Sequence, residues 1–484
     1  MAFDDLKDFL KVLRERNELH EVEVEMDPSW EVSAVCRKIF DERGPALLFH
    51  RVGNHRTPLL VGALTTRTRY QIGLGLGDQP TSIALIREKW SNAFKNPIPP
   101  KTIARSQAPC KQVKAKGVDL YADPFPVPLW HHQDSAPYLG TLHAVITKDP
   151  ETGWINLGNY RNEIRSRDQL GVFIIPYRHI GLHLQKWKAI GKPMPIAIAV
   201  GLETALNLVA VAPVKAGQSE YDVAGGLKGK PVEVVEAETC DLLVPAHAQI
   251  VIEGYVPIDE TLPQEGPFGE FAGYIGEQVY NCNFMKVTAV TYQENPIFQG
   301  TYEGLPPNES TTVRSIGRST SLYDHLTGVV GLPGIVDVCV TEGGCAGFHA
   351  VVSIQNSYPG HVRDVMMNCW GQPTLFVKNV IVVDEDMDPW DPVKVEWAIA
   401  TTMKPTRDIE IVKRGTSISI DPSSPRPGSG QSGAIVTDLL GIDATRPHFD
   451  YEEKGSTFPQ LAVPKPEHMK TVRENWARYG FRSS

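Results

Sequence analysis

Residues 120–305 carry the feature that most limits how this chain can fold, a dense series of strand-sized segments with turn sequences between them. Residues 142–147 and 284–292 are rich in β-branched and aromatic side chains. The turn 148–153, which lies between the strand-like segments 142–147 and 154–157, contains Asp, Pro and Gly. Strands at this density close into a barrel or pack as a sandwich. We therefore predict a central β-domain with helical structure inserted around residues 177–190.

The regions before and after this β-domain mix helices with strands. Apolar residues recur at helical spacing over 3–14, and strand-like runs follow. The glycine-rich run 73–77 does not match the dinucleotide-binding fingerprint, so we predict a loop there. After residue 306, strands such as 335–341 alternate with a helix near 393–401, as in an α/β layer. The predicted parts of this mixed α+β chain are an N-terminal α/β domain (1–118), the β-domain (119–305), a C-terminal α/β domain (306–460) and a terminal helix (461–484).

Composition excludes several classes of protein. The 484 residues include 48 basic and 57 acidic side chains, a net charge of −9, with no long run of one sign. This balance argues against nucleic acid or an anionic membrane as the main partner. The longest apolar stretches are strand-sized, and the first residues lack the order of a signal peptide. Seven scattered cysteines without a Cys-x-x-Cys pair predict reduced thiols in a cytoplasmic protein, and no thiolate zinc site.

The segment Glu265-Gly-Pro-Phe-Gly-Glu270 places two carboxylates five residues apart on a turn. Gly and Pro restrict the turn to a few conformations, so both carboxylates are expected to be held in position. Neighbouring charges push the pKa values of paired acids apart, which suits proton transfer, and an arginine between them would keep one ionised. Considered alone, the hexapeptide also fits a polar surface turn.

Further polar residues suggest a metal site. Asn156, His179 and Glu220 together offer oxygen and nitrogen ligands suited to magnesium or manganese. His179 and His183 share one face of the expected helix, so a metal-dependent hydrolase is an alternative, although such a pair lacks the His-Glu-x-x-His general base and is more often structural. The run 428–433 misses the G-x-S-x-G elbow by one position, which gives little support to a serine hydrolase.

Seven segments spread over nearly the whole chain carry a family resemblance. They are 156–161, 178–179, 219–227, 238–246, 265–270, 378–386 and 441–445. In this order they resemble the UbiD family of reversible decarboxylases, which use prenylated flavin mononucleotide (prenylated FMN). The resemblance implies an N-terminal α/β domain, a central split β-barrel that binds the flavin, and a C-terminal α/β domain used for oligomerisation.

The resemblance also implies how the cofactor is held. Asn156, His179 and Glu220 match the family's metal ligands, usually to Mn²⁺, and backbone near Ala210 and Ala212 would complete a K⁺ site. Both cations would bridge the protein to the flavin phosphate, because a buried dianion needs cations. The positions that match the family's cofactor-binding residues are Asn156, Leu157, Gly158, Asn159, Tyr160, Arg161, Arg178, His179 and Lys378.

By the same match, Arg161, Glu265 and Glu270 form the family's catalytic network. Glu265 would orient Arg161, Arg161 would hold the substrate carboxylate, and Glu270 would return a proton to the carbon that loses CO₂. Glu270 must be neutral for that step, which burial favours. Loss of CO₂ from an sp² carbon leaves a poorly stabilised carbanion, so an electron-accepting cofactor must carry the difficult step.

One segment, 306–314, departs from part of the family. Several members that act on aromatic acids have a histidine where this chain has Ser310, and this chain adds Arg314 and Arg318. The change argues against phenol-directed general base chemistry. It favours a substrate with an extra anionic or hydrogen-bonding group.

The sequence thus predicts a decarboxylase of an aromatic, heteroaromatic or α,β-unsaturated carboxylic acid, with a flavin prenyltransferase as cofactor supplier. A non-catalytic flavin-binding subunit is a further alternative, disfavoured by the complete arginine–glutamate set. We also predict a homodimer or higher homo-oligomer joined through residues after 306. The apolar side chains at helical spacing in the terminal helix are Met469, Val472, Trp476 and Tyr479.

Overall fold

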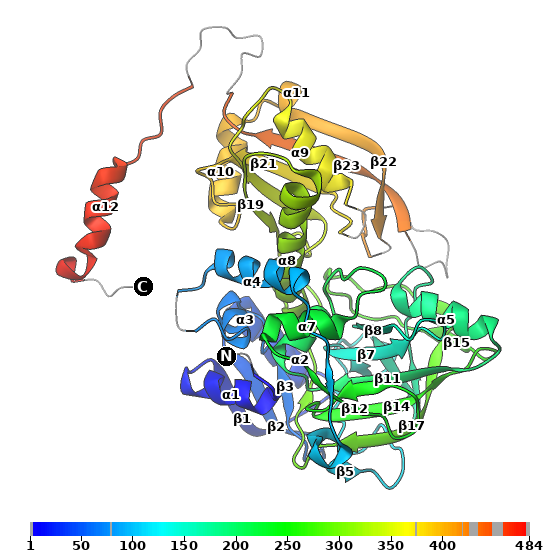
Figure 1. The fold of residues 1–484 in the computed structure, drawn as a ribbon. Coiled ribbons are helices and arrows are strands. Elements are labelled where there is room, and N and C mark those ends of the chain that lie inside the picture. The colour runs from blue at the N-terminus through cyan, green and yellow to red at the C-terminus, as the bar shows by residue number, and fades with distance from the viewer. Residues whose placement is uncertain are drawn as a thin grey trace.

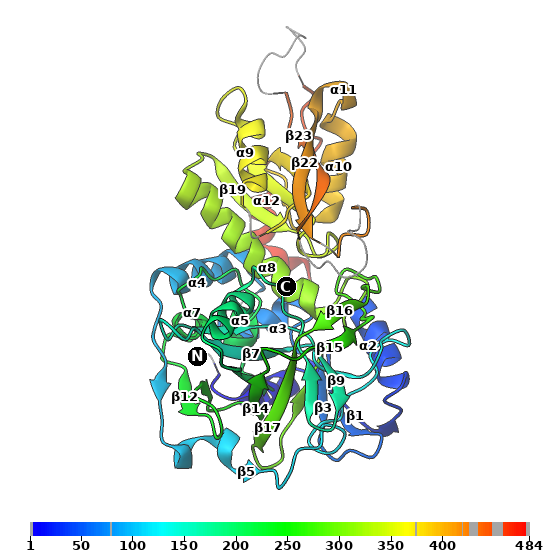
Figure 2. The same ribbon diagram turned by 90° about the vertical axis from the view of Figure 1, so that its right-hand side faces the viewer.

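The structure, a computed structural model, describes residues 3–77, 80–372, 375–418, 420–424, 434–447 and 458–480. The predicted mixed α+β class is confirmed: an N-terminal region, a central curled β-domain and a C-terminal α/β domain follow one another along the chain. Helix α8 runs from the lower body into the C-terminal domain, as two views at right angles show (Figures 1 and 2). The run 428–433 lies outside the described residues.

The N-terminal region packs helices on a four-stranded sheet. Helix α1 begins after Asp5, whose side chain accepts a hydrogen bond from the Lys7 amide at 2.8 Å, and buries the apolar face predicted for 3–14. The fourth strand, β18, comes from Phe298–Gln299, more than two hundred residues later in the chain. The elements are α1 (Leu6–Glu15), β1 (Leu19–Met26), α2 (Glu31–Asp41), β2 (Ala46–Val52), β3 (Leu59–Val61), α3 (Arg67–Gly73) and α4 (Ile83–Lys95).

The central domain is built on a nine-stranded sheet that curls like a split barrel. Alternate residues of a strand point to opposite faces, and β11 shows the consequence: Ile196, Ile198 and Val200 enter one core, while Ala197 and Ala199 enter the other. The nine strands of this sheet are β5 (Val113–Lys114), β6 (Tyr138–Gly140), β7 (His143–Lys148), β8 (Ile155–Gly158), β9 (Asn162–Ser166), β10 (Gln169–Gly171), β11 (Met194–Val200), β14 (Ile250–Val256) and β17 (Phe284–Tyr292). A three-stranded sheet contains β4 (Lys101–Thr102), β12 (Glu233–Glu236) and β13 (Leu243–Pro245), and a two-stranded sheet contains β15 (Leu262–Glu265) and β16 (Val279–Cys282). The helices of the domain are α5 (His179–Ala189), α6 (Thr204–Val209) and α7 (Glu220–Lys228).

The C-terminal domain is a five-stranded sheet in the order β19-β20-β21-β23-β22. Its three middle strands are parallel and both of its edge pairs are antiparallel. Helices α9 and α10 pack against apolar side chains of opposite faces. The elements are α8 (Glu309–Asp324), β19 (Ile335–Val340), β20 (His349–Ile354), α9 (His361–Trp370), β21 (Asn379–Asp384), α10 (Pro392–Thr402), α11 (Pro405–Asp408), β22 (Ile409–Ile418) and β23 (Ala434–Ala444).

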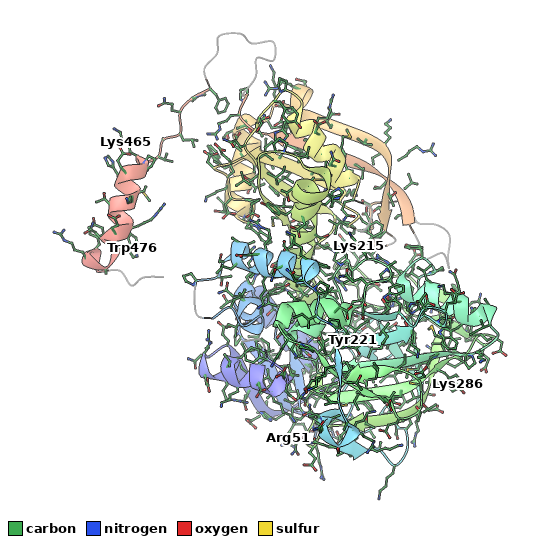
Figure 3. The ribbon with its side chains drawn as sticks, in the orientation of Figure 1. Arg51, Lys215, Tyr221, Lys286, Lys465 and Trp476 are labelled. Carbon is green, nitrogen blue, oxygen red and sulfur yellow. The ribbon has the colours of Figure 1, made fainter. Side chains whose placement is uncertain are left out.

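The terminal helix α12 (Pro466–Glu474) and the short turn Trp476–Tyr479 lie apart from the rest of the molecule, as the labelled Lys465 and Trp476 show (Figure 3). None of their residues is buried. The four residues of the predicted apolar stripe are therefore all at least partly exposed.

The structure also bears on membrane-spanning helices and on the cysteines. None of the helices in the described residues has the length and apolar character needed to cross a bilayer. All seven cysteines are free thiols, and five of them are buried.

Candidate active site

A cavity of about 430 Å³ lies between the central domain and the C-terminal domain. Strand β8, the first turns of α5 and α7, the turn after β15, and helix α8 contribute to its wall. Phe376, Ile418 and Ile420 line it from the C-terminal domain. The predicted site residues on the wall are Asn156, Leu157, Gly158, Asn159, Tyr160, Arg178, His179, Glu220 and Glu270.

Arg161 lies between the two glutamates of the predicted network. Its Nε and Nη2 donate to the two oxygens of Glu265 at 2.8 and 2.6 Å, and its Nη1 donates to Glu270. The Tyr138 hydroxyl donates to the same Glu265 carboxylate at 2.8 Å. The guanidinium also lies 4.2 Å from the centre of the Phe173 ring. The guanidinium of Arg161 is therefore fixed from several directions. It reaches the wall of the cavity through its bond to Glu270, which lines the cavity.

The turn from Glu265 to Glu270 is held by its own backbone. Gly266 has φ +80°, a left-handed conformation that L side chains rarely adopt. Gly269 passes so close to the His131 ring that a Cβ there would meet it at 2.2 Å, and its amide donates to Asp134 at 2.8 Å. The Glu270 amide donates to the Tyr274 carbonyl at 2.9 Å. These contacts hold the turn that brings Glu270 to the wall of the cavity.

Burial sets the charge state of this network. It raises the pKa of Glu270, with the charge of Glu265 acting in the same direction, while Arg161 and Arg314 oppose the shift. Burial alone would lower the pKa of Arg161, but the two glutamates outweigh it and raise the pKa, so the guanidinium stays charged. A carboxyl group that binds a proton more readily than usual, next to a permanent cation, can both donate and recover that proton.

The three predicted metal ligands all line the part of the cavity formed by β8, α5 and α7. His179 is the first residue of α5 and Glu220 the first of α7, and the His179 Nδ1 lies 3.9 Å from Glu220 Oε1. Glu220 Oε2 accepts from the Leu157 amide at 2.8 Å, which ties it to β8 next to Asn156. Burial raises the pKa of Glu220. A hard divalent cation fits this donor set and would offset the cost of the buried carboxylate.

Backbone around β8 shapes the same part of the cavity. The ring of Tyr160 folds back over Gly158, where a Cβ would meet it at 2.6 Å, so glycine is required there. The Asn159 amide donates to the Ala210 carbonyl at 3.0 Å, and the Ala212 carbonyl accepts from Val214 at 2.9 Å. Each carbonyl oxygen keeps a second lone pair that could serve a cation.

Lys378 is placed differently from the expectation. Its Nζ lies 3.1 Å from Asp421 and also donates to Ser423. It is not among the residues that line the cavity. The lysine carries the charge expected of a phosphate ligand, but in this structure that charge is met by Asp421.

His183 does not support the hydrolase alternative. Its Nδ1 pairs with the Thr147 hydroxyl at 2.9 Å, and burial lowers its pKa to about 4. Among the described residues, the one group of three His, Cys, Asp or Glu ligand atoms close enough to share an ion is Glu21, Glu23 and His50, far along the chain from His179. His179 therefore lines the cavity, whereas His183 is a buried core residue.

Several wall residues were missed by sequence reasoning. Phe173 and Phe271 cover the guanidinium groups of Arg161 and Arg314, and Phe376, Ile418 and Ile420 come from a different domain. They are ordinary apolar residues in the sequence, and only the packing of the two domains brings them to the cavity.

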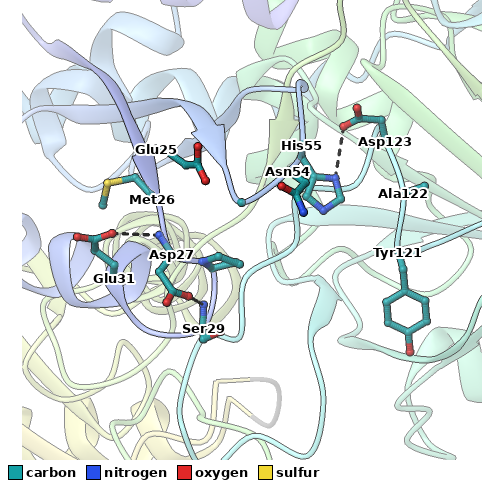
Figure 4. Close-up of a pocket in the computed structure, with 12 residues that line it drawn as sticks. Glu25, Met26, Asp27, Ser29, Glu31, Asn54, His55, Tyr121, Ala122 and Asp123 are labelled. Atoms are coloured by element: carbon teal, nitrogen blue, oxygen red, sulfur yellow. Dashed lines mark hydrogen bonds and ion pairs between the residues drawn. The ribbon is translucent and has the colours of Figure 1, made fainter.

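Two other cavities lack these features. One of about 870 Å³ lies between the N-terminal region and residues 121–123 (Figure 4), where Glu31 accepts from the Asp27 amide at 3.0 Å and His55 lies 3.4 Å from Asp123. The other, of about 630 Å³, has a mainly apolar wall around Trp390. Neither is lined by a residue predicted for the site.

Comparison with known families matches most of the chain. Domain models of 3-octaprenyl-4-hydroxybenzoate carboxy-lyase match in the order N-terminal domain (10–89), Rift-related domain (101–306) and C-terminal domain (311–444). These matches agree with the resemblance seen in the short segments.

Solved structures extend the comparison to nearly every residue. The UbiD-class enzyme HmfF from Pelotomaculum thermopropionicum in complex with FMN is 30% identical, with a TM-score of 0.85 over 97% of this chain and 99% of that one. An evolved dimeric form of HmfF in complex with prFMN is 29% identical, with a TM-score of 0.82 over 96% and 97%. Vanillic acid decarboxylase from Sedimentibacter hydroxybenzoicus, in its closed form, is 28% identical, with a TM-score of 0.84 over 99% and 100%. With the three domains in order and 30% identity along the whole fold, this chain belongs to the UbiD family of carboxy-lyases.

Proposed function

We propose that the protein is a reversible, non-oxidative decarboxylase that uses prenylated FMN to release CO₂ from an aromatic, heteroaromatic or α,β-unsaturated carboxylic acid. The observation that carries the proposal is the Arg161 guanidinium, held by Glu265 and bonded to Glu270 at the wall of the cavity. A binding module has no need of a buried acid with a raised pKa beside a fixed cation.

The wall of the cavity fits the cofactor. Asn156, His179 and Glu220 would hold Mn²⁺ or a similar divalent metal, and the carbonyl groups of Ala210 and Ala212 would hold K⁺; together these cations suit a phosphate group. Arg178 and residues 156–161 would bind the rest of the flavin. When bound, prenylated FMN supplies an electron-accepting ring for the electron pair of the breaking bond.

The chain's own residues then have distinct tasks. Arg161 binds the substrate carboxylate through its N–H groups that do not bond Glu265, and Glu265 keeps the guanidinium in one orientation. Neutral Glu270 donates its proton to the carbon that has lost CO₂ and becomes a carboxylate next to Arg161. In the carboxylation direction the same carboxylate removes the proton from that carbon.

The substrate is an acid that needs no histidine base. Ser310 stands where several family members have histidine, and its hydroxyl donates to Glu303 at 2.5 Å inside the protein. A serine engaged in this way does not take up a proton from a phenol. We therefore favour acids without a phenolic hydroxyl.

The proposal also covers the source of the cofactor and the cellular compartment. A flavin prenyltransferase would provide the cofactor, and free thiols at all seven cysteines suit a reducing compartment, the cytoplasm. We propose that the protein works as a homodimer or larger homo-oligomer.

The proposal is tested on protein produced with and without a flavin prenyltransferase. With it, we expect a flavin absorption spectrum, bound manganese, and CO₂ release from an unsaturated or aromatic acid. Glu270→Gln should keep the flavin, lose roughly a hundredfold or more in turnover, and fail to exchange the product's vinylic or aryl hydrogen for deuterium. Normal exchange by this variant would move the proton donor elsewhere. Protein that binds flavin but releases CO₂ from no acid would support the non-catalytic alternative.

A further inference from the structure

Helix α8 brings two arginines to the Glu270 end of the cavity. The helix begins after Asn308, whose side chain accepts from the Thr311 amide at 2.9 Å, and it continues to Asp324. Arg314 and Arg318 are four residues apart, so they share one face of the helix. Both line the cavity together with Glu270 and Phe271.

One nitrogen of the Arg314 guanidinium lacks the hydrogen-bond partner that a buried polar atom normally has. Its guanidinium lies 4.3 Å from the centre of the Phe271 ring, and its Nη1 is buried with no hydrogen-bond partner among the described residues. Arg318 differs, because its Nη1 donates to the Ala346 carbonyl at 2.7 Å. A buried charge without a partner is costly, and planar guanidinium groups bind carboxylates through two parallel hydrogen bonds. Arg314 is therefore prepared for an anion that comes from outside the chain.

The charges around Arg314 leave room for such an anion. Arg178, Arg314 and Arg318 line the cavity, and Arg161 adds a fourth guanidinium that is paired with Glu265 and Glu270. Burial raises the pKa of Glu303, behind Ser310, to about 7. When Glu270 holds the proton that catalysis requires and Glu303 is neutral, Glu265 balances one of these four charges, and the two carboxyl groups that act on Arg314 carry no charge. One reacting carboxylate balances only one of the remaining positive charges.

We propose that Arg314 binds a second carboxylate of the substrate, so that the acid consumed by this enzyme is a dicarboxylic acid. The proposal rests on the proposed function and extends it. The C–C bond to the reacting carboxylate breaks, CO₂ leaves, and a C–H bond forms with the proton of Glu270. The product is a monocarboxylic acid that keeps the group bound by Arg314.

The flavin phosphate is the rival ligand for Arg314. The predicted metal ligands for that phosphate lie on β8, α5 and α7, whereas Arg314 lies on α8 against Phe271, which follows Glu270 directly. The charge of Arg314 acts on Glu270, which favours the substrate, and it also acts on Arg178 beside His179, so the phosphate is the alternative that the test must separate. The content of bound flavin in variants distinguishes the two ligands directly.

The test measures binding on flavin-loaded protein by calorimetry, with pairs of acids that differ in one carboxylate. The pairs are cinnamate with 4-carboxycinnamate, and benzoate with isophthalate and with terephthalate. We expect at least one dicarboxylate to bind about tenfold or more tightly than its partner, as an added charge-assisted bond predicts. Arg314→Met should abolish this preference at unchanged flavin content, and Arg314→Lys should restore part of it.

Arg87→Met is the matched control, because the Arg87 guanidinium also lies over an aromatic ring, Tyr323 at 4.1 Å, but does not line the cavity. It should keep the preference for the dicarboxylate. Equal affinity within every pair in the unmodified enzyme would overturn the proposal, and so would loss of flavin from Arg314→Met. A dicarboxylate preference without CO₂ release would keep the binding assignment and overturn the proposed function instead.

Discussion

Arg161 bonds both oxygens of Glu265, from Nε at 2.8 Å and from Nη2 at 2.6 Å. Two parallel bonds fix the plane of the guanidinium as well as its position. The remaining nitrogen, Nη1, is thereby directed at Glu270. Glu265 thus acts through Arg161, as a positioning residue, on both substrate binding and proton transfer.

Glu265→Gln should change the pH dependence of turnover. The charge of Glu265 raises the pKa of Glu270, so its removal should lower that pKa. The proton donor is then lost at lower pH, and the alkaline limb of the kcat profile should move to lower pH. We also expect a tenfold or larger loss of kcat/KM, because the neutral amide weakens the charge-assisted bonds that hold Arg161.

Glu163→Gln is the control for this variant. Glu163 is a buried glutamate that pairs with Arg165 at 3.0 Å and does not line the cavity. Its profile should keep its position on the pH axis. An unshifted profile in Glu265→Gln, at unchanged flavin content, would contradict the positioning role.

Glu220→Ala should separate the fold from cofactor retention. Removal of the carboxylate leaves His179 and Asn156 as the proposed metal ligands, which is too few for a hard cation. We expect manganese content and flavin content to fall together, while circular dichroism stays unchanged. Glu151→Ala, at a glutamate whose side chain is 65% exposed, should keep both. Full flavin occupancy in Glu220→Ala would remove the metal assignment.

The sequence predicted the parts of the site that local chemistry determines. Glycine and proline limit the turn between Glu265 and Glu270 to a few conformations, and the family resemblance placed Arg161 with the two acids. The site depends on tertiary packing elsewhere. Phe376 and Ile418 line the cavity only because the C-terminal domain meets the central domain.

The same limit applies to the fold. The density of strand-sized segments and turns predicted the central β-domain, but no local pattern shows that Phe298–Gln299 joins the N-terminal sheet as β18. Lys378 has the charge of a phosphate ligand, yet the position of Asp421 decides where that charge goes. Pairing between distant segments is decided by the packed structure, and a two-residue strand leaves almost no periodic signal.

Glu303 predicts a pH dependence of stability. Burial raises its pKa from the ordinary 4.5 to about 7, while the charge of Arg314 and the bond from Ser310 oppose the shift. Between these pH values the folded state holds a proton that the unfolded chain has released, so the free energy of unfolding falls as pH rises from 4.5 to about 7 and levels off above that. Glu303→Gln cannot ionise and should lose this contribution. Thermal unfolding from pH 4 to 8 measures it, and parallel curves for the two proteins would contradict the assignment.

The C-terminal helix predicts a subunit contact. Helix α12 and the turn after it bury none of their residues, and Trp476 and Tyr479 are 38% and 50% exposed. Exposed aromatic surface favours burial at about 25 cal/mol per Å², and neither side chain is fully buried. Deletion of residues 466–484 should therefore lower the oligomeric mass measured by light scattering at micromolar concentration, at unchanged flavin content.

Trp476→Ser together with Tyr479→Ser should have the same effect in the full chain, and Lys470→Ser, at an exposed charged position of the same helix, should have none. A full-length protein that is a monomer would contradict the oligomer, whereas an unchanged oligomer after the deletion would place the contact elsewhere in the C-terminal domain.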